Sequence, residues 1–234
     1  MDFEIVTAVS NDKYLKKMEL TIPTWNKKPQ FKNRKLTVFH IGFDDLSKLD
    51  FIKEYFPDVN LVKWELEGCE SQRELVLSCF VLGVKHIKSE YYVKFDCDSF
   101  VTDTQDVFLE GDFKYDLFSN SWGYTKPGKW IRELDEWCER NNIEGEPIYN
   151  PKKDRGEKYR HRRIASFICL HKTEFVRNIV NKYVDKRLPV PSHDTFLWYM
   201  AERLLGRKWG GASIKQRGVS TRTSLRGLRS EIYG

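Results

Sequence analysis

Short apolar runs and longer amphipathic stretches alternate along the first half of the chain. The apolar runs are rich in β-branched and aromatic residues, which is typical of buried strands. They cover residues 3–9, 35–41, 60–64 and 91–95. Apolar positions recur with helical spacing over residues 12–20, 46–56 and 75–85. This regular alternation predicts an α/β fold with a mostly parallel, Rossmann-like sheet and helices on both faces.

Polar residues mark several expected helix boundaries. Ser10, Asn11 and Asp12 supply caps for the first helix, and Pro23 is expected to end it. Ser71 and Glu74 have the spacing of a capping box, which predicts a helix start immediately before Leu75.

The second half has a less regular pattern. Residues 117–120 and 164–170 are expected to form strands, and the polar insertion between them, rich in Trp, Gly and charge, is expected to be a loop. Residues 173–185 and 192–205 have helical patterns behind Ser/Thr caps, whereas the tail after Gly206 has no clear period.

At 234 residues the chain is long enough for one α/β core, and no Gly/Ser/Pro-rich linker divides it. We therefore expect a single domain over residues 1–234, with one functional half at 1–105 and the other at 106–234. The longest apolar stretch, residues 75–84, is much shorter than the roughly 20 residues that span a bilayer. The acidic start, residues 1–4, lacks the features of a signal peptide, and the five cysteines include no C-x-x-C pair. These features predict a cytoplasmic protein.

Two carboxylates follow the apolar run at 91–95. Asp96 and Asp98 stand where the strand ends, and open α/β sheets bind their ligands beyond the carboxyl ends of such strands. On an extended chain the two side chains face the same side while Cys97 turns inward. Hard cations such as Mg²⁺ or Mn²⁺ suit this pair, and substrate phosphates and water would complete their coordination. The alternative is a pair of solvated strand-end carboxylates.

Positive charge is concentrated in two segments. Residues 152–163 contain seven Lys/Arg against two acids, and residues 207–229 contain seven Lys/Arg and no acid. The two segments thus carry +5 and +7, although the whole chain carries only +6. A local excess of this kind predicts contact with a polyanion, and a solvated basic loop is the alternative for each segment. The candidate phosphate contacts are Lys152, Arg162, Arg163, Arg217, Arg222 and Arg226.

Several motifs, in this order, resemble the GT-A class of nucleotide-sugar glycosyltransferases, and the resemblance covers most of residues 3–205. They are Arg73 and Leu75 followed by Gly83, the segment Tyr92-Val-Lys-Phe-Asp-Cys-Asp-Ser99, and Ile164–Phe167 followed by His193-Asp194 at a helix start.

The resemblance implies roles for three carboxylates. Asp98 would bind a divalent metal on the donor diphosphate directly, and Asp96 would contact the metal or the ribose. Asp194 matches the acid that takes the proton from the acceptor hydroxyl in inverting members. It could equally be an acid that the helix dipole stabilises without a catalytic duty. Many metal-dependent members have a late histidine in the metal shell, but no histidine follows His193 here.

Other donor contacts are expected around the nucleotide. Arg73 lies in the first turn of its helix, where backbone N–H groups already favour phosphate, although a solvated surface arginine would look the same. The resemblance also implies contacts between the nucleotide base and Thr7, Ala8 and Asp44 or Asp45, at the ends of the first two strands. A uridine-diphosphate sugar, such as UDP-glucose, is the expected donor.

Three functions remain open at this stage. A glycosyltransferase with an anionic acceptor accounts for both the carboxylates and the basic segments. Its acceptor could be a hydroxymethylated base in DNA, or equally lipopolysaccharide or another glycan. A haloacid-dehalogenase-type phosphatase also uses Asp-x-Asp at a strand end, usually on its first strand. A nucleic-acid-binding module without catalysis would explain the basic segments but not the carboxylates.

Overall fold

The structure, a computed structural model, describes residues 1–69, 71–120, 124–125, 129–148, 161–162, 165–190, 192–205, 209–211, 217–221 and 224–233. The strands are β1 (Phe3–Val9), β2 (Leu36–His40), β3 (Val59–Lys63), β4 (Tyr91–Phe95), β5 (Ser99–Val101), β6 (Leu117–Asn120), β7 (Tyr124–Thr125), β8 (His161–Arg162), β9 (Ala165–Lys172), β10 (Gly210–Gly211) and β11 (Val219–Thr221). The α-helices are α1 (Asp12–Trp25), α2 (Gln72–Leu82), α3 (Lys129–Arg140), α4 (Thr173–Tyr183), α5 (His193–Leu205) and α6 (Leu225–Tyr233).

A seven-stranded sheet forms the centre of the molecule, in the order β10-β6-β9-β4-β1-β2-β3. Strands β4, β1, β2 and β3 pair in parallel, as do β10 and β6. Only β9 runs against its neighbours β4 and β6. The expected mostly parallel sheet is therefore confirmed, and its central strands β1 and β4 end on the same edge.

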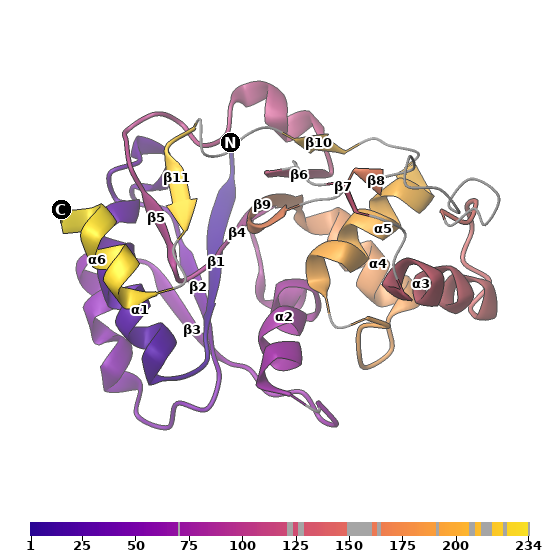
Figure 1. The fold of residues 1–234 in the computed structure, drawn as a ribbon, viewed down its shortest axis with the longest axis horizontal. Coiled ribbons are helices and arrows are strands. Elements are labelled where there is room, and N and C mark those ends of the chain that lie inside the picture. Colours follow the sequence, from indigo (N-terminus) through magenta and orange to yellow (C-terminus); the bar gives the residue numbers. More distant parts are fainter. Residues whose placement is uncertain are drawn as a thin grey trace.

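Helices cover both faces of this sheet (Figure 1). On β1, Val6 and Ala8 face a core that includes side chains of α2, α3, α4 and α5. Ile5 and Val9 face the opposite core, which contains α1 and the residue 46–54 segment. This alternation follows from the period of two along a strand and confirms the expected helices on both faces.

Helix α1 differs from the prediction, because Pro23 does not end it. The helix continues to Trp25, with Pro23 in its last turn. The indole N–H of Trp25 donates to the carbonyl of Ser99 at 2.8 Å, and the backbone N–H of Val101 donates to Thr24 Oγ1 at 3.0 Å. These buried contacts with β5 offset the hydrogen bond that proline cannot make.

Three further segments differ from the sequence-based expectation. Residues Leu46–Glu54 form a 3-10 helix rather than an α-helix. The polar insertion contains α3, whose Ile131, Leu134 and Cys138 are buried, so the helical spacing of these apolar residues was overlooked. The tail after Gly206 is also structured, because it contributes β11 and α6.

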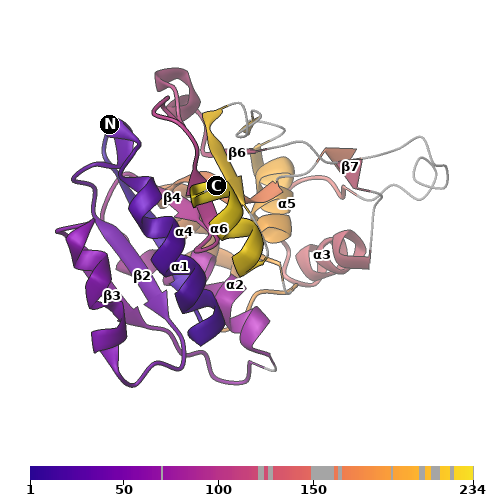
Figure 2. The ribbon, with the colours of Figure 1, turned by 60° about the vertical axis from the view of Figure 1, so that its left-hand side comes forward.

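The C-terminal elements return to the first half of the chain. Strand β11 pairs antiparallel with β5, and α6 packs against α1 (Figures 1 and 2). Gly218, with φ of +67°, precedes β11, and a Cβ there would lie 2.1 Å from the carboxylate of Asp103. A glycine is required for this close approach. In the part of the chain that the structure describes, no helix is long and apolar enough to cross a membrane.

Candidate active site

A pocket of about 530 Å³ opens at the carboxyl ends of β1 and β4. Its lining residues come from the end of β1, the start of α1, helix α2 and the turn after β4. They are Ala8, Ser10, Tyr14, Gln72, Arg73, Val76, Leu77, Phe80, Asp96, Cys97 and Asp98. The volume lies within the range of small-molecule sites, and the position is where open α/β sheets bind ligands.

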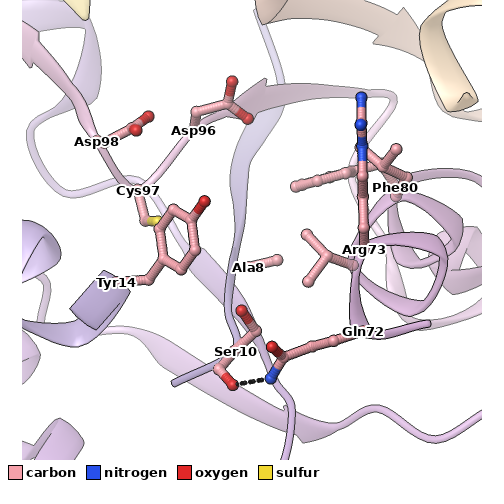
Figure 3. A pocket seen from close by; sticks show the side chains of 11 residues that line it. Ala8, Ser10, Tyr14, Gln72, Arg73, Phe80, Asp96, Cys97 and Asp98 are labelled. Atoms are coloured by element: carbon pink, nitrogen blue, oxygen red, sulfur yellow. Dashed lines mark hydrogen bonds between the residues drawn. The ribbon is translucent and has the colours of Figure 1, made fainter. Parts of the chain in front are cut away.

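Asp96 and Asp98 line the same pocket, although by a different route from the expected extended chain. Strand β4 ends at Phe95, and Asp96–Ser99 form a turn in which the backbone N–H of Ser99 donates to the carbonyl of Asp96 at 2.9 Å. Figure 3 shows the two carboxylates on one side of the pocket and the Arg73 side chain on the other. The turn, rather than strand alternation, brings the pair together.

Each carboxylate is paired with a buried lysine that the sequence analysis missed. Lys94 Nζ lies 2.5 Å from Asp96 Oδ1, and Lys17 Nζ lies 2.9 Å from Asp98 Oδ2. The lysine side chains are only 1% and 3% exposed, whereas the carboxylates are 32% and 17% exposed. The ammonium groups therefore lie on the protein side of the carboxylates, away from the pocket opening.

Burial shifts the pKa values of the Asp96 pair. Loss of solvation raises the pKa of Asp96 to about 6, although the charge of Lys94 acts in the opposite direction. Burial also acts against the charge of Lys94, but neighbouring negative charges, that of Asp96 foremost, and the hydrogen bond to Asp96 together raise the pKa of Lys94. Asp96 is therefore half ionised at about pH 6 and becomes predominantly ionised only at higher pH.

Asp194 and His193 open α5 close to this pair. Asp194 accepts a hydrogen bond from the hydroxyl of Ser192 at 2.7 Å and is near enough to Lys94 and Asp96 for their charges to interact. Burial acts to raise the pKa of Asp194, but the interaction with His193, the Ser192 hydrogen bond and the Lys94 charge together lower it below its usual value. His193 is 1% exposed, packs against the ring of Phe80, and has its pKa lowered to about 3 by burial. Near neutral pH the site thus presents an ionised Asp194 beside a neutral imidazole.

Helix α2 provides the wall opposite the carboxylates. Ser71 caps it by accepting a hydrogen bond from the backbone N–H of Glu74 at 3.1 Å, so the predicted capping is confirmed. Arg73 is exposed in the first turn, where the helix dipole favours an anion. Gln72 also belongs to this wall, Ser10 lies beside it, and Tyr14 lies on the side of Cys97 and Asp98 (Figure 3). They were missed because polar residues at element ends are common in any sequence.

The residues expected at the nucleotide base are not all brought together. Ala8 lines the pocket. Thr7 is fully buried on the opposite side of β1, with Ile5 and Val9, and so does not line it. Asp44 lies exposed in the loop after β2 and is not a lining residue, and Asp45 caps the following 3-10 helix by accepting from the backbone N–H of Ser47 at 3.0 Å.

The candidate phosphate contacts differ in their exposure to solvent and in their contacts within the protein. Arg226 is exposed on α6, as is Arg229. Arg217 is engaged internally: its guanidinium contacts the carboxylate of Asp112, donates to the carbonyl of Val107 at 2.9 Å and lies 5.3 Å from the ring centroid of Phe118. Lys152, Arg163, Arg222 and the side chain of Arg162 lie outside the described residues.

The chemistry of Asp96 and Asp98 fits an Mg²⁺ or Mn²⁺ ion that shares its coordination with a substrate. Their oxygens are the hard donors that these ions prefer, and both residues line a pocket with room for phosphates. The described residues hold no cluster of three or more His, Cys, Asp or Glu side chains suited to a metal. A cation here would therefore need substrate or water oxygens for most of its ligands.

No protein-family model matches the sequence, and no curated protein does. Solved structures do match the fold. Galactosyltransferase LgtC, in complex with donor and acceptor sugar analogues, aligns with a TM-score of 0.54 over 99% of this chain and 96% of LgtC, at 8% identity. Core-mannan synthase A (CmsA, or Ktr4) from Aspergillus fumigatus, in its Mn/GDP form, aligns with a TM-score of 0.55 over 85% of this chain and 70% of that chain, at 13% identity. The chain therefore has the fold of GT-A-type glycosyltransferases, as its sequence motifs predicted.

Proposed function

We propose that this protein is a glycosyltransferase that moves a sugar from a nucleoside-diphosphate sugar to a hydroxyl group, with Mn²⁺ or Mg²⁺ as its cofactor. One observation carries the proposal. Asp96 and Asp98 lie in the wall of a pocket at the carboxyl ends of β1 and β4, within a fold shared with LgtC and CmsA. An acidic pair at this edge suits a cation bound to a diphosphate.

The donor is proposed to be a uridine-diphosphate sugar. The pocket has space for a nucleotide, and the N-terminal turn of α2 with Arg73 offers positive charge for its phosphates. A bound Mn²⁺ or Mg²⁺ would stabilise the negative charge that develops on the departing diphosphate. The GDP bound in the CmsA structure makes guanosine diphosphate the alternative nucleotide to test.

Asp194 is the proposed general base. The bond from the anomeric carbon to the diphosphate oxygen breaks, a new bond forms to the acceptor oxygen, and the acceptor proton passes to Asp194. The carboxylate is ionised near neutral pH and held by the hydroxyl of Ser192. Its low pKa makes it a weak base, so it would act best on a proton that becomes acidic as the new bond forms.

The proposed acceptor is anionic. The two basic segments motivate this, and Arg226 and Arg229 on α6 are exposed members of them. DNA that carries a hydroxymethylated base is the first candidate, because phosphates would meet these side chains. Lipopolysaccharide or another phosphorylated glycan is the second. A haloacid-dehalogenase-type phosphatase is less well supported, because Asp96 follows β4 rather than the first strand.

Calorimetry with UDP and GDP, each with Mn²⁺ and then with excess chelator, tests the donor site. We expect Asp98→Asn to abolish metal-dependent nucleotide binding, because the change removes a ligand charge. It also leaves the buried ammonium of Lys17 without its carboxylate, so the unfolding transition should be lowered, and binding is compared where circular dichroism shows that the variant is folded. Asp106→Asn, on an exposed residue outside the pocket, is the matched control. Equal nucleotide binding in chelator, or by Asp98→Asn, would contradict the proposal.

A further inference from the structure

Two buried lysines give the acidic pair an unusual charge balance. Lys17 comes from α1 and Lys94 from the last part of β4. The ammonium of Lys17 contacts one oxygen of Asp98, and that of Lys94 contacts one oxygen of Asp96. The lysines are buried, so they face the carboxylates from within the protein. A donor in the pocket would meet the carboxylates first.

The surroundings hold both ammonium groups in place. Lys94 Nζ lies 5.2 Å from the ring centroid of Phe80, and Lys17 Nζ lies 4.6 Å from that of Tyr14. Each cation thus has a carboxylate on one side and an aromatic ring nearby. A buried ammonium that lost its carboxylate would be left as an uncompensated charge, so both pairs are expected to persist when a ligand binds.

Ion pairs that persist would reduce the negative charge and the number of unengaged carboxylate oxygens that a divalent cation meets. Two carboxylates alone would present two negative charges, but the lysines bring the group of four side chains to a net charge of zero, so that the nearby Asp194 carboxylate is left as the one unbalanced negative charge among these five side chains. The attraction for a cation is correspondingly weaker. One oxygen of each carboxylate is also engaged by an ammonium. A diphosphate would add both negative charge and oxygen ligands.

We propose that Lys17 and Lys94 are internal counter-ions that make Asp96 and Asp98 a conditional metal site, which binds Mn²⁺ weakly alone and firmly together with a nucleoside diphosphate. This rests on the proposed function, because it takes the pocket as the donor site. The lysines act as positioning residues: they fix the carboxylates and set their net charge. Their effect is to couple metal and nucleotide binding, so that each ligand tightens the other by the same factor.

Electron paramagnetic resonance of free Mn²⁺ measures this coupling without any catalytic turnover. Mn²⁺ is titrated into the wild-type protein alone, with UDP and with GDP. We expect the nucleotide to tighten Mn²⁺ binding about tenfold or more, and Mn²⁺ to tighten nucleotide binding equally. Equal Mn²⁺ affinity with and without a nucleotide that binds would overturn the inference and leave the proposed function standing.

A lysine variant tests the counter-ion role independently of the nucleotide. Lys17→Met should bind Mn²⁺ alone about tenfold more tightly than the wild type, because an ammonium no longer balances the negative charge of Asp98. Lys16→Met is the matched control: it removes the same charge from an exposed neighbour on α1. Lys17→Arg, which keeps the charge, should stay near the wild type.

Two results decide between these possibilities. If Lys17→Met binds Mn²⁺ no better than Lys16→Met, the counter-ion role is wrong. If neither UDP nor GDP binds to the wild type under any condition, the proposed function fails, and the Mn²⁺ affinities of the variants still decide the role of Lys17. Circular dichroism checks folding, and Lys17→Gln, which keeps a donor for Asp98 without the charge, replaces Lys17→Met if that variant does not fold.

Discussion

Lys28 joins three segments of the chain, and replacing it with methionine should loosen all three. The side chain is fully buried just after α1. Its ammonium donates to Asp103 Oδ1 at 2.6 Å, to the carbonyl of Gln105 at 2.5 Å and to the carbonyl of Arg217 at 2.8 Å. The first two acceptors lie in the loop after β5, and the third precedes β11.

The expected loss of stability follows from these contacts. A hydrogen bond that involves a charged group contributes roughly 1.5–3 kcal/mol, and three such bonds set the upper bound. Asp103 is 40% exposed, so water can replace the ammonium there and its share must be discounted. The two carbonyls carry most of the effect. We therefore expect Lys28→Met to lower the free energy of unfolding by about 3–4 kcal/mol.

The loss should extend to the proposed metal site, because β5 and its partner β11 directly follow and flank the turn that holds Asp98. Ser99 follows Asp98 directly, and β5 pairs with β11 from Ser99↔Thr221 to Val101↔Val219. If the junction at Lys28 opens, this pairing loses its anchor. Metal-dependent nucleotide binding by Lys28→Met should then weaken even under conditions where the variant is folded.

Urea unfolding and nucleotide calorimetry measure the two effects. Lys48→Met is the control, because Lys48 is 46% exposed and lies 3.4 Å from the exposed Asp12, a surface pair that should contribute less than about 1 kcal/mol. A loss for Lys28→Met as small as that of Lys48→Met would refute the reasoning. So would a stability loss of the expected size with unchanged metal-dependent nucleotide binding, for the part that concerns Asp98.

Three more predictions concern catalysis, pH and the acceptor. Asp194→Asn should abolish sugar transfer, measured as product formed, with nucleotide affinity near wild type; loss of nucleotide binding would contradict the role of Asp194 as a base. Between pH 6.5 and about 3, His193 binds a proton in the unfolded chain but not in the folded protein, so acid should destabilise the wild type more than His193→Phe. The extra loss of unfolding free energy, measured with urea, should be about 1.4 kcal/mol between about pH 7.5 and 5.5. Parallel curves of unfolding free energy against pH for the two proteins would refute this. If DNA is the acceptor, affinity for duplex should fall steeply with salt, and Arg226→Gln with Arg229→Gln should flatten the slope; salt-independent or absent binding would favour a glycan.

The sheet and the location of the site could be predicted because they depend on local patterns. Apolar runs in the first half of the chain became β1 to β4, and parallel pairing placed the residues after Phe95 and Val9 at one edge. The capping pattern at Ser71 likewise predicted the start of α2, and with it the position of Arg73. In each case a few neighbouring residues determine the structure.

The lysine pairs could not be predicted in the same way, because their partners are distant or hidden by context. Lys17 and Asp98 are 81 residues apart, and nothing near either residue indicates the other. Lys94 did carry a signal: a charge within an apolar strand, two residues before Asp96, lies on the same side as that carboxylate if the strand continues. A buried lysine requires a partner of opposite charge, so an ion pair between Lys94 and Asp96 could have been predicted from the sequence.

Arg217 shows why a count of basic residues in a sequence overestimates the number of basic side chains that an anionic acceptor could contact. The segment 207–229 carries seven basic residues, yet the guanidinium of Arg217 is 16% exposed and satisfied by Asp112 and the carbonyl of Val107. Replacing Arg217 would disturb the junction with β11 and lower stability, and weaker acceptor binding could then follow from a loosened site. The salt experiment therefore uses Arg226 and Arg229, whose exposed side chains on α6 can lose their charge without removing an internal contact of this kind.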